Sequence, residues 1–286
     1  MQKSRHLGQV GVLFVVATPI GNLEDITLRA IETLRSVDLI ASEDTRKSRI
    51  LLQRWNISKS LVSLHRFTER SKTYLLLERI QKGQNIALIS DAGTPAISDP
   101  GHRLVRAALE AGIRVVPIPG PSSIMAALSV SGTDCSSFVY LGFVPKQEGS
   151  RRIFFERLTT EERTSVFFES PKRIVGTLKE MAVILGPRPL VLVRELTKIH
   201  EEVLSGTASE ILQTLQERDS VRGEITVVVR GSSQPKSDIQ IETAVKTLLE
   251  EGYTGKRLAD EACKRSGVKK RAAYDKFLEI KRDNKG

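Results

Sequence analysis

The sequence predicts an α/β fold with two α/β domains and a small C-terminal helical module, and three observations support this. Short apolar runs alternate with segments of helical periodicity through most of the 286 residues. Residues 117–121 contain three prolines and one glycine, which indicates a break between domains. A polar segment at residues 231–238 separates the last apolar run from three helical segments. Alternating strands and helices are typical of a mainly parallel sheet covered by helices.

The first half is expected to contain five short strands, each followed by a helical segment. In the first helical segment Ile26, Ala30, Ile31 and Leu34 fall on one side, which is the spacing of a helix that packs on a sheet. The strands are expected at residues 12–18, 39–42, 61–64, 86–89 and 114–118. The helices between them are expected at residues 27–36, 46–55, 71–82 and 102–111.

The second half has fewer strand–helix units and longer loops, which favours a mixed sheet. Strands are expected at residues 138–144, 165–168, 190–194 and 224–229, and helices at 122–130, 151–158, 173–185 and 208–216. The tail contains helical segments at 239–251, 256–266 and 271–282, with Gly252 and Gly267 at the positions of C-terminal caps. A helix-turn-helix type of module fits this pattern. The expected domains are 1–120, 121–231 and 239–286.

The formal net charge of +10 suggests a polyanionic partner, with nucleic acid first and an acidic membrane surface second. Eleven lysines and arginines lie within residues 256–285, so the tail favours RNA or DNA as the partner. Two plainer interpretations stay open, namely a merely basic soluble protein and a passive helical appendage.

Several classes of protein lack support in this sequence. The two cysteines, Cys135 and Cys263, form no disulfide framework or zinc spacing, and the four histidines are scattered, so we expect no metal. We expect a cytoplasmic protein, since no apolar run approaches the ~20 residues that cross a bilayer. The apolar run at residues 12–17 is also too short for an export signal. The chain has no Walker A loop and no nucleophile elbow, and its first loop has one of the three glycines of a dinucleotide site.

The most informative segment is the loop at residues 90–101, which follows a short apolar strand. It contains two Ser-Asp pairs, two glycines and two prolines. In an open α/β sheet, ligands bind outside the carboxyl ends of the strands, and ordinary connections there run only ~2–6 residues. The loop therefore predicts a ligand site. The alternative is an ordinary connection in which Asp99 caps the next helix.

Other loops add polar groups at predicted strand ends. Pro19 and Gly21 lie in the first loop, and Glu43 and Asp44 precede Arg46 in the second, where they serve as a base, a metal site or a helix cap. Together the loops favour a ligand held by backbone and small polar groups. A neutral or zwitterionic adenosyl ligand suits such a site better than a polyphosphate.

The chain resembles the tetrapyrrole methylase superfamily in six ordered motifs. These motifs lie at residues 17–22, 43–46, 90–101, 119–123, 169–173 and 194–198. The resemblance covers residues 11–231 and is to the branch that modifies ribosomal RNA. It implies two α/β domains with S-adenosylmethionine in the cleft between them. It also implies methyl transfer to the ribose 2′-oxygen of a cytidine in the decoding region of 16S rRNA, in the small ribosomal subunit, by a homodimer.

The resemblance also implies roles for individual residues. The implied cofactor-binding residues are Pro19, Gly21, Ser90, Asp91, Ala92, Gly93, Thr94, Pro95, Ser122, Phe168, Glu169, Leu196 and Gly223. The first loop reads Thr-Pro-Ile-Gly-Asn rather than the glycine-rich loop of methylases that act on tetrapyrroles, which argues against a tetrapyrrole substrate. The rival functions are a small-molecule methyltransferase of this fold and a non-enzymatic RNA-binding assembly factor.

A ribose hydroxyl is a weak acid, so its methylation gains from a positioned base. The candidate bases are Asp25, Glu43, Asp44, Glu169 and Glu195, of which Glu43 and Glu195 are preferred, and Lys146 or Lys198 are candidates to stabilise an oxyanion. The candidate RNA-binding cations are Arg46, Lys47, Arg49, Arg66, Lys146, Arg151, Arg152, Lys172 and Arg173. Trp55, Phe143 and Tyr253 are candidate stacking rings, with positions in the core as the alternative.

Overall fold

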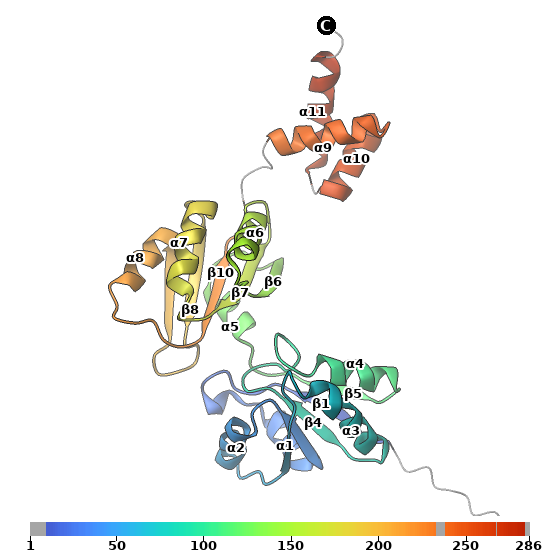
Figure 1. The fold of residues 1–286 in the computed structure, drawn as a ribbon, viewed down its shortest axis with the longest axis vertical. Coiled ribbons are helices and arrows are strands. Elements are labelled where there is room, and N and C mark those ends of the chain that lie inside the picture. The colour runs from blue at the N-terminus through green and yellow to red at the C-terminus, as the bar shows by residue number, and fades with distance from the viewer. Residues whose placement is uncertain (1–9, 233–237, 267, 284–286) are drawn as a thin grey trace, which may run out of the picture. The chain divides into compact units, whose positions relative to one another are not determined.

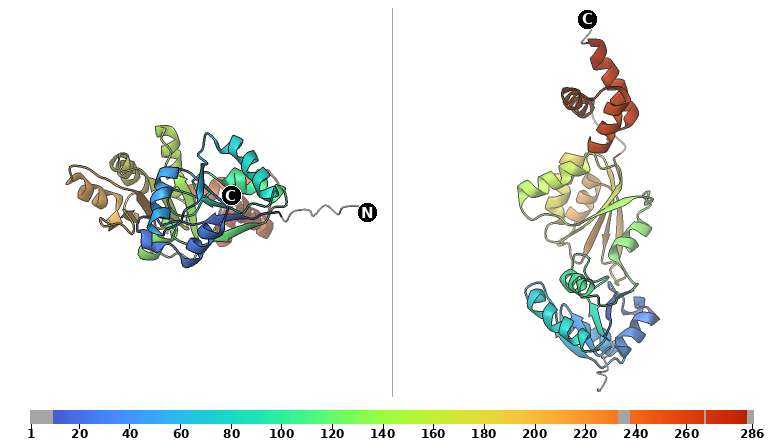
Figure 2. Two further views of the ribbon diagram at one scale, coloured as in Figure 1. Left: turned by 90° about the horizontal axis from the view of Figure 1, so that it is seen from below. Right: turned by 90° about the vertical axis from the view of Figure 1, so that its right-hand side faces the viewer.

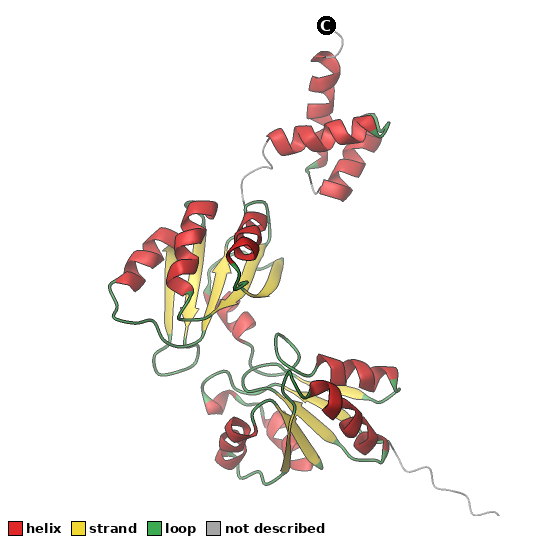
Figure 3. Cartoon of the chain, in the orientation of Figure 1, coloured by secondary structure: helices red, strands yellow, loops and turns green. Residues whose placement is uncertain are grey.

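The computed structural model describes residues 10–232, 238–266 and 268–283. The described chain forms two compact units. The first reaches to Phe155 and continues over Arg163–Arg230, and it contains both sheets (Figures 1 and 3). The second combines Glu156–Glu162 with the C-terminal helices. The α/β class with C-terminal helices is therefore confirmed, while the expected domain boundaries stay a prediction.

The first sheet is entirely parallel, with the strand order β3-β2-β4-β1-β5. Its strands are β1 (Leu13–Val16), β2 (Leu39–Ser42), β3 (Ser60–Ser63), β4 (Ile86–Ile89) and β5 (Val115–Ile118). The connecting elements are η1 (Leu23–Asp25), α1 (Leu28–Ser36), α2 (Thr45–Arg54), α3 (Glu69–Gln81) and α4 (His102–Glu110). Because the strands are parallel, the loops that leave their carboxyl ends all lie along one edge of the sheet.

Helices cover both faces of the first sheet, as two views of the ribbon show (Figures 1 and 2). Strand β4 explains why: Ala87 and Ile89 belong to the core under α1 and α2, while Ile86 and Leu88 belong to the core under α3 and α4. Alternate side chains of a strand point to opposite faces, so a strand buried on both sides has to be continuously apolar. The run Ile-Ala-Leu-Ile meets that requirement.

The second sheet is mixed, as expected, with the order β6-β7-β10-β8-β9. Its strands are β6 (Phe138–Phe143), β7 (Thr164–Glu169), β8 (Pro189–Arg194), β9 (Glu202–Thr207) and β10 (Ile225–Val229). Its helices are α5 (Ser123–Val130), α6 (Glu148–Leu158), α7 (Ile174–Leu185) and α8 (Ala208–Gln216). Strand β10 pairs antiparallel with both β7 and β8, which places its first residues beside the last residues of β7 and β8.

Strand β9 is the element that the sequence pattern failed to predict. It is an edge strand that pairs only with β8, and its residues alternate between exposed and half-buried positions. With so little apolar surface, Glu202–Thr207 has no strong periodic signal. Its conformation depends on pairing with β8, which a local pattern does not reveal.

The C-terminal unit contains α9 (Asp238–Glu250), α10 (Gly255–Ser266) and α11 (Lys270–Asp283) around its own apolar core. Gly252 has a positive φ of 85° just after α9, as expected of a C-terminal cap. Gly267, the second expected cap, and most of the predicted linker at 231–238 lie outside the described residues. Among the helices that the structure describes, none has the length and apolarity that a membrane span requires.

Candidate active site

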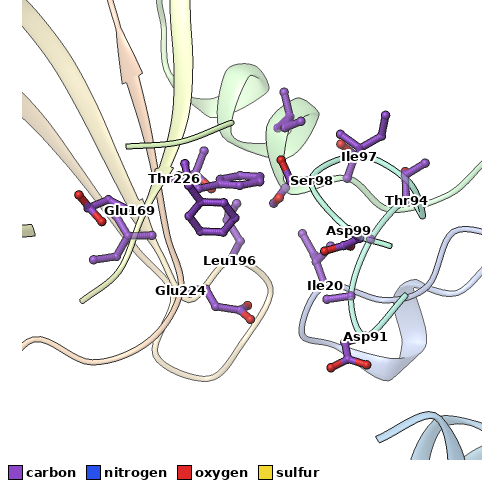
Figure 4. Close-up of a pocket in the computed structure, with 18 of the residues that line it drawn as sticks. Ile20, Asp91, Thr94, Ile97, Ser98, Asp99, Glu169, Leu196, Glu224 and Thr226 are labelled. Carbon is purple, nitrogen blue, oxygen red and sulfur yellow. The ribbon is translucent and has the colours of Figure 1, made fainter. Parts of the chain in front are cut away.

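The first unit contains a cavity of about 690 Å³ between the loops of the two sheets (Figure 4). One wall comes from the loops after β1, β2 and β4 and from the start of α5. The other comes from β6, the end of β7, the start of β10 and the loop after β8. The volume is in the range of small-molecule sites, which are ~300–1,000 Å³.

The loop after β4 is held in place by the first loop of the chain. Thr18 and Gly93 exchange backbone hydrogen bonds, with N–O distances of 2.9 and 3.0 Å. The Thr18 hydroxyl also donates to the carbonyl oxygen of Ser90 at 3.2 Å. Gly93 has a φ of +75°, a conformation that L side chains rarely adopt. The two loops therefore form one continuous wall.

The interpretation of Asp99 as a helix cap is wrong. The N-cap position of α4 is Gly101, and the acceptor is the carboxylate of Glu69 on α3. Glu69 Oε1 accepts from the backbone N–H groups of Gly101 at 2.9 Å and Arg103 at 3.0 Å. Asp99 instead lines the cavity. Because the buried Glu69 of α3 caps α4, the Asp99 carboxylate is available to a ligand.

Five carboxylates line the cavity among the described residues, and three of them accept hydrogen bonds from cationic side chains. Asp91 accepts from Lys47 Nζ at 2.8 Å and from the backbone N–H of Asp44 at 2.9 Å. Glu169 is fully buried and accepts from Arg173, the Thr177 hydroxyl and the Ser170 N–H. Glu224, which is largely exposed, accepts from Lys198 Nζ at 3.0 Å.

The other two carboxylates, those of Glu43 and Asp99, have raised pKa values. Burial is the main cause at both positions, and neighbouring carboxylates add to it. Burial and the charges of Asp91 and Glu224 raise the pKa of Asp99 to about 6, against a partial lowering by a hydrogen bond from Ser90. The Glu43 pKa is raised by burial and by Asp99 and Asp91, and lowered in part by Lys47.

The charge of this cavity indicates the kind of ligand that it accepts. Lys47 is the only basic side chain among the described lining residues, and Asp91 already pairs with it. A polyphosphate would face uncompensated carboxylates here, whereas a cationic sulfonium and ammonium would be stabilised by them. The apolar side chains of the wall, among them Ile20, Phe168 and Leu196, suit an adenosine moiety. The residues present therefore fit S-adenosylmethionine.

Most residues predicted for the site are brought together by the fold. The predicted residues that line the cavity are Glu43, Asp91, Ala92, Gly93, Thr94, Ser122, Phe168, Glu169, Leu196 and Gly223. The predicted residues that do not line it are Pro19, Gly21, Ser90, Pro95, Lys146 and Glu195. Lys146 is exposed beyond the end of β6.

Gly21 lies behind the wall and contacts the loop after β8. A Cβ at Gly21 would be 2.5 Å from Lys198 Cγ and 2.7 Å from the carbonyl oxygen of Leu196. The next residue, Asn22, donates its backbone N–H to the Thr197 hydroxyl at 3.0 Å. Glu195 and Thr197 have positive φ values of 52° and 63°, so the β8 loop has a strained shape at this contact.

The Glu195 carboxylate accepts two hydrogen bonds, which make it a weaker base. Its Oε1 accepts from Lys198 Nζ at 2.8 Å and from the backbone N–H of Glu224 at 3.0 Å. The hydrogen bond from Lys198 is the largest cause that lowers the Glu195 pKa. The side chain also packs across Gly223, where a Cβ would be 2.3 Å from Glu195 Cγ. These contacts fit a residue that positions the loop.

The aromatic residues near the cavity were only partly foreseen. Tyr140 and Phe143 both meet Phe168 edge to face, with ring centroids 5.2 and 5.3 Å apart. Phe143 is 58% exposed, whereas Trp55 and Tyr253 pack against apolar cores. Phe143 and Phe168 were predicted for the site, whereas Tyr140 was missed, because an aromatic in a strand usually belongs to a core.

The candidate RNA-binding cations differ in exposure and in the contacts that they make. Arg46, Lys47, Arg151 and Arg173 each form an ion pair with a carboxylate. Arg49, Arg66, Lys146, Arg152 and Lys172 have exposed side chains. Arg151 and Arg173 are partly buried and pair with Glu180 and Glu169. These ion pairs would have to break before either arginine could bind an RNA phosphate.

Comparisons with known proteins show the family of this chain. The family described as Tetrapyrrole (Corrin/Porphyrin) Methylases matches residues 12–212. The protein named ribosomal RNA small subunit methyltransferase I from Escherichia coli O157:H7 is 44% identical, with 94% of this chain and 95% of the relative covered. The protein of that name from Bacillus subtilis (strain 168) is 40% identical, with 94% of each chain covered.

Solved structures show the same fold at low sequence identity. Diphthine synthase aligns with a TM-score of 0.59 at 16% identity, covering 77% of this chain and 90% of its own. Uroporphyrin-III-C-methyltransferase from Thermus thermophilus aligns with a TM-score of 0.55 at 19% identity, covering 77% and 94%. The chain thus belongs to the tetrapyrrole methylase family, in the group named ribosomal RNA small subunit methyltransferase I, and is a methyltransferase that uses S-adenosylmethionine.

Proposed function

We propose that this protein transfers a methyl group from S-adenosylmethionine to the ribose 2′-oxygen of a cytidine in the decoding region of 16S rRNA. The observation that carries the proposal is an acidic cavity between the two sheets, in a chain 44% identical to a ribosomal RNA methyltransferase over 273 residues. The basic C-terminal unit supports a nucleic-acid substrate over a tetrapyrrole.

We assign the methionine and ribose parts of the cofactor to the loop after β4. Asp91, Ala92, Gly93 and Thr94 line the cavity there, and the Ser90 hydroxyl donates to the carbonyl oxygens of Ala92 and Gly93. Pro95 belongs to the same proposed segment. The adenine side is assigned to Phe168, Leu196 and Gly223, which line the opposite wall, and to Ser122 at the start of α5. Glu169 lies beside them, but its carboxylate is already bonded, so it contributes packing and backbone atoms.

The donor supplies a methyl carbon made electrophilic by the positive sulfur. The protein contributes position and charge: the loops of both sheets hold donor and ribose in line, an effect worth up to ~7–11 kcal/mol in well-oriented reactions. A carboxylate at the cavity has to accept the proton of the ribose hydroxyl. Glu43 lines the cavity with a raised pKa, which fits this task better than Glu195 does.

RNA binding is assigned to the exposed cations of the first unit and to the C-terminal unit. On α10 and in the turn before α11, Lys256, Arg257, Lys264 and Lys269 are exposed. Contacts between such cations and phosphates supply affinity that is independent of sequence and weakens with salt. Phe143, which is exposed beside the cavity, is the best placed of the three candidate rings to stack on a base.

Replacing Lys256, Arg257, Lys264 and Lys269 with glutamine is expected to weaken rRNA binding and leave cofactor binding unchanged. For single-stranded RNA, the slope of log affinity against log salt should fall by about 0.7 for each phosphate contact that is lost. Filter binding over a salt series measures this slope. The matched control exchanges lysine and arginine at the same four positions and should retain affinity. Unchanged affinity in the glutamine variant would show that the module is a passive appendage.

The proposed activity is tested with labelled S-adenosylmethionine and small ribosomal subunits that lack the modification. We expect label in 16S rRNA, recovered after digestion as 2′-O-methylcytidine by mass analysis. Transfer to a tetrapyrrole precursor instead of rRNA would favour the small-molecule methyltransferase. Binding of rRNA without any thermal shift at millimolar donor would favour the non-enzymatic assembly factor.

The homodimer and the cytoplasmic location are further parts of this proposal. A methyltransferase that modifies ribosomal subunits has to share their compartment, which supports the cytoplasm. Homodimerisation follows from the family resemblance, and light scattering coupled to gel filtration tests it: a mass near twice 31.7 kDa is expected.

A further inference from the structure

Asp99 differs from the other carboxylates of the cavity, because the charges that act on it are negative and its hydrogen-bond partner is the neutral Ser90 hydroxyl. Of the five carboxylates among the described lining residues, Asp91, Glu169 and Glu224 accept hydrogen bonds from cationic side chains. The positive charge of Lys47 lowers the pKa of Glu43 and so offsets part of the increase that its acidic neighbours cause. The charges that act on Asp99 come from Asp91 and Glu224, and both are negative. Asp99 is thus the carboxylate with the strongest reason to accept a proton.

The backbone around Asp99 is held in a shape that places its side chain at the cavity. Ala96 and Ser98 have positive φ values of 67° and 65°, a strained conformation for a residue other than glycine. The Ser98 hydroxyl is 2.6 Å from the Tyr140 hydroxyl of the second sheet, which ties this part of the loop to the opposite wall. Strain of this kind persists only where the surroundings enforce it.

The helix that follows Asp99 does not use its carboxylate. Glu69 accepts the N–H groups of Gly101 and Arg103 in its place. Figure 4 shows the Asp99 side chain extending from the loop toward the wall that carries Leu196 and Glu224. A side chain positioned by two strained residues, and relieved of the capping role by a buried glutamate from another helix, is arranged for an interaction with a ligand.

We propose that Asp99 is the general base of the reaction, an inference that rests on the proposed function. Asp99 takes the proton of the attacking ribose hydroxyl as the oxygen–methyl bond forms. The sulfur–methyl bond breaks, its electron pair stays on sulfur, and the products are a methyl ether, a neutral thioether and a protonated Asp99. The proton then passes to solvent. A base is most effective when its pKa lies near the operating pH, and the pKa of Asp99 is about 6.

The proposal predicts the pH dependence of the enzyme. A base works in its ionised form, so kcat/KM, whose pH profile reports ionisation in the free enzyme, should rise through pH 6 and level off above pH 7. The groups that face Asp99 are Asp91, Glu224, Glu43, Tyr140 and the Ser90 hydroxyl. Removing Asp99 should remove the acidic limb of the profile, whereas a residue that only shapes the loop would lower the rate at every pH alike.

Asp99→Asn is expected to lower kcat by about 10²–10⁴-fold, with donor affinity within a few-fold of the parent. Asp99→Glu should restore part of kcat, and the rate of this variant should again rise with pH on the acidic side of the profile. Donor binding is measured by calorimetry with the intact protein, and kcat by transfer to ribosomal subunits. The exposed Asp219→Asn serves as the matched control and should change neither quantity.

Three results would overturn the assignment. The first is an Asp99→Asn protein that keeps both the rate and the acidic limb. The second is a loss confined to donor affinity, with kcat retained at saturation, which would make Asp99 a cofactor ligand. If Glu43→Gln rather than Asp99→Asn abolished the limb, the base would be Glu43. Failure of the proposed function is distinguishable, because the parent protein would then not methylate rRNA at any pH.

Discussion

Gly21→Ala is expected to lower kcat/KM by about 10²-fold while the protein stays folded. The added Cβ would be 2.5 Å from Lys198 Cγ, 2.7 Å from the Leu196 carbonyl oxygen and 2.8 Å from the Thr197 hydroxyl. Lys198 has a flexible side chain, but the Leu196 carbonyl is backbone, so one of the two loops has to move. Leu196 lines the cavity, and a displacement of ~1 Å in a group that positions the substrate lowers the catalytic rate by about this factor.

The loss should appear in donor affinity as well as in kcat. Moving the β8 loop also disturbs the hydrogen bond from the Asn22 N–H to Thr197 and the pair of bonds that Glu195 accepts. Calorimetry with S-adenosylmethionine and single-turnover transfer measure the two effects separately. Gly176→Ala is the matched control: its Cβ meets nothing within 4 Å, and it lies inside α7. That control should keep full activity and gain about 0.5–1 kcal/mol of stability.

Glu69→Ala is expected to lower the free energy of unfolding by about 2–4 kcal/mol. Its side chain is 5% exposed and accepts two backbone N–H groups at the start of α4. Removing the carboxylate leaves both donors without that acceptor, one of them in a buried position and the other in a part-buried one, and a buried unsatisfied group costs about 1–3 kcal/mol. The negative charge at a helix N-terminus is lost as well, which adds a few tenths of a kcal/mol or more.

Chemical denaturation measures this loss, and two further variants show its cause. Glu69→Gln keeps an acceptor oxygen and should lose about 1 kcal/mol. Glu78→Ala on the same helix removes an exposed glutamate paired with Lys82 and should stay within about 0.5 kcal/mol of the parent. Equal stability for the Glu69→Ala and Glu78→Ala proteins would contradict the capping role. Since α4 follows the loop that lines the cavity, Glu69→Ala should also weaken donor binding.

The loop after β4 was predictable because its signals are local. A continuous apolar run predicts a strand buried on both faces, and β4 has the predicted bounds, Ile86–Ile89. Gly93 and the residues around it were expected to meet a ligand, since glycine and proline fix turns wherever they stand. Asp91, Gly93 and Thr94 do line the cavity.

The carboxylates at the same loops were harder to rank. Glu43, Glu169 and Glu195 look alike in sequence, since each is an acid near a strand end and near a cation. They differ in their partners: Glu169 is saturated, Glu195 accepts from Lys198 and Glu224, and Glu43 is left with a raised pKa. A pKa depends on burial and on charges from several elements at once, so spacing along the chain does not rank these residues.

The sequence by itself determined the α/β class, the mixed second sheet, the helical tail and the loop that lines the cavity. Apolar periodicity and turn residues act over a few positions, so the sequence alone reveals them. Only the tertiary structure decided which carboxylates line the cavity without a cationic partner. Glu69 caps a helix 32 residues away, Glu224 donates to a carboxylate 29 residues away, and Asn22 meets a hydroxyl 175 residues away. Contacts over such separations arise only when the chain folds. Because of them, Asp99 does not cap α4, and the Glu195 carboxylate already accepts two hydrogen bonds.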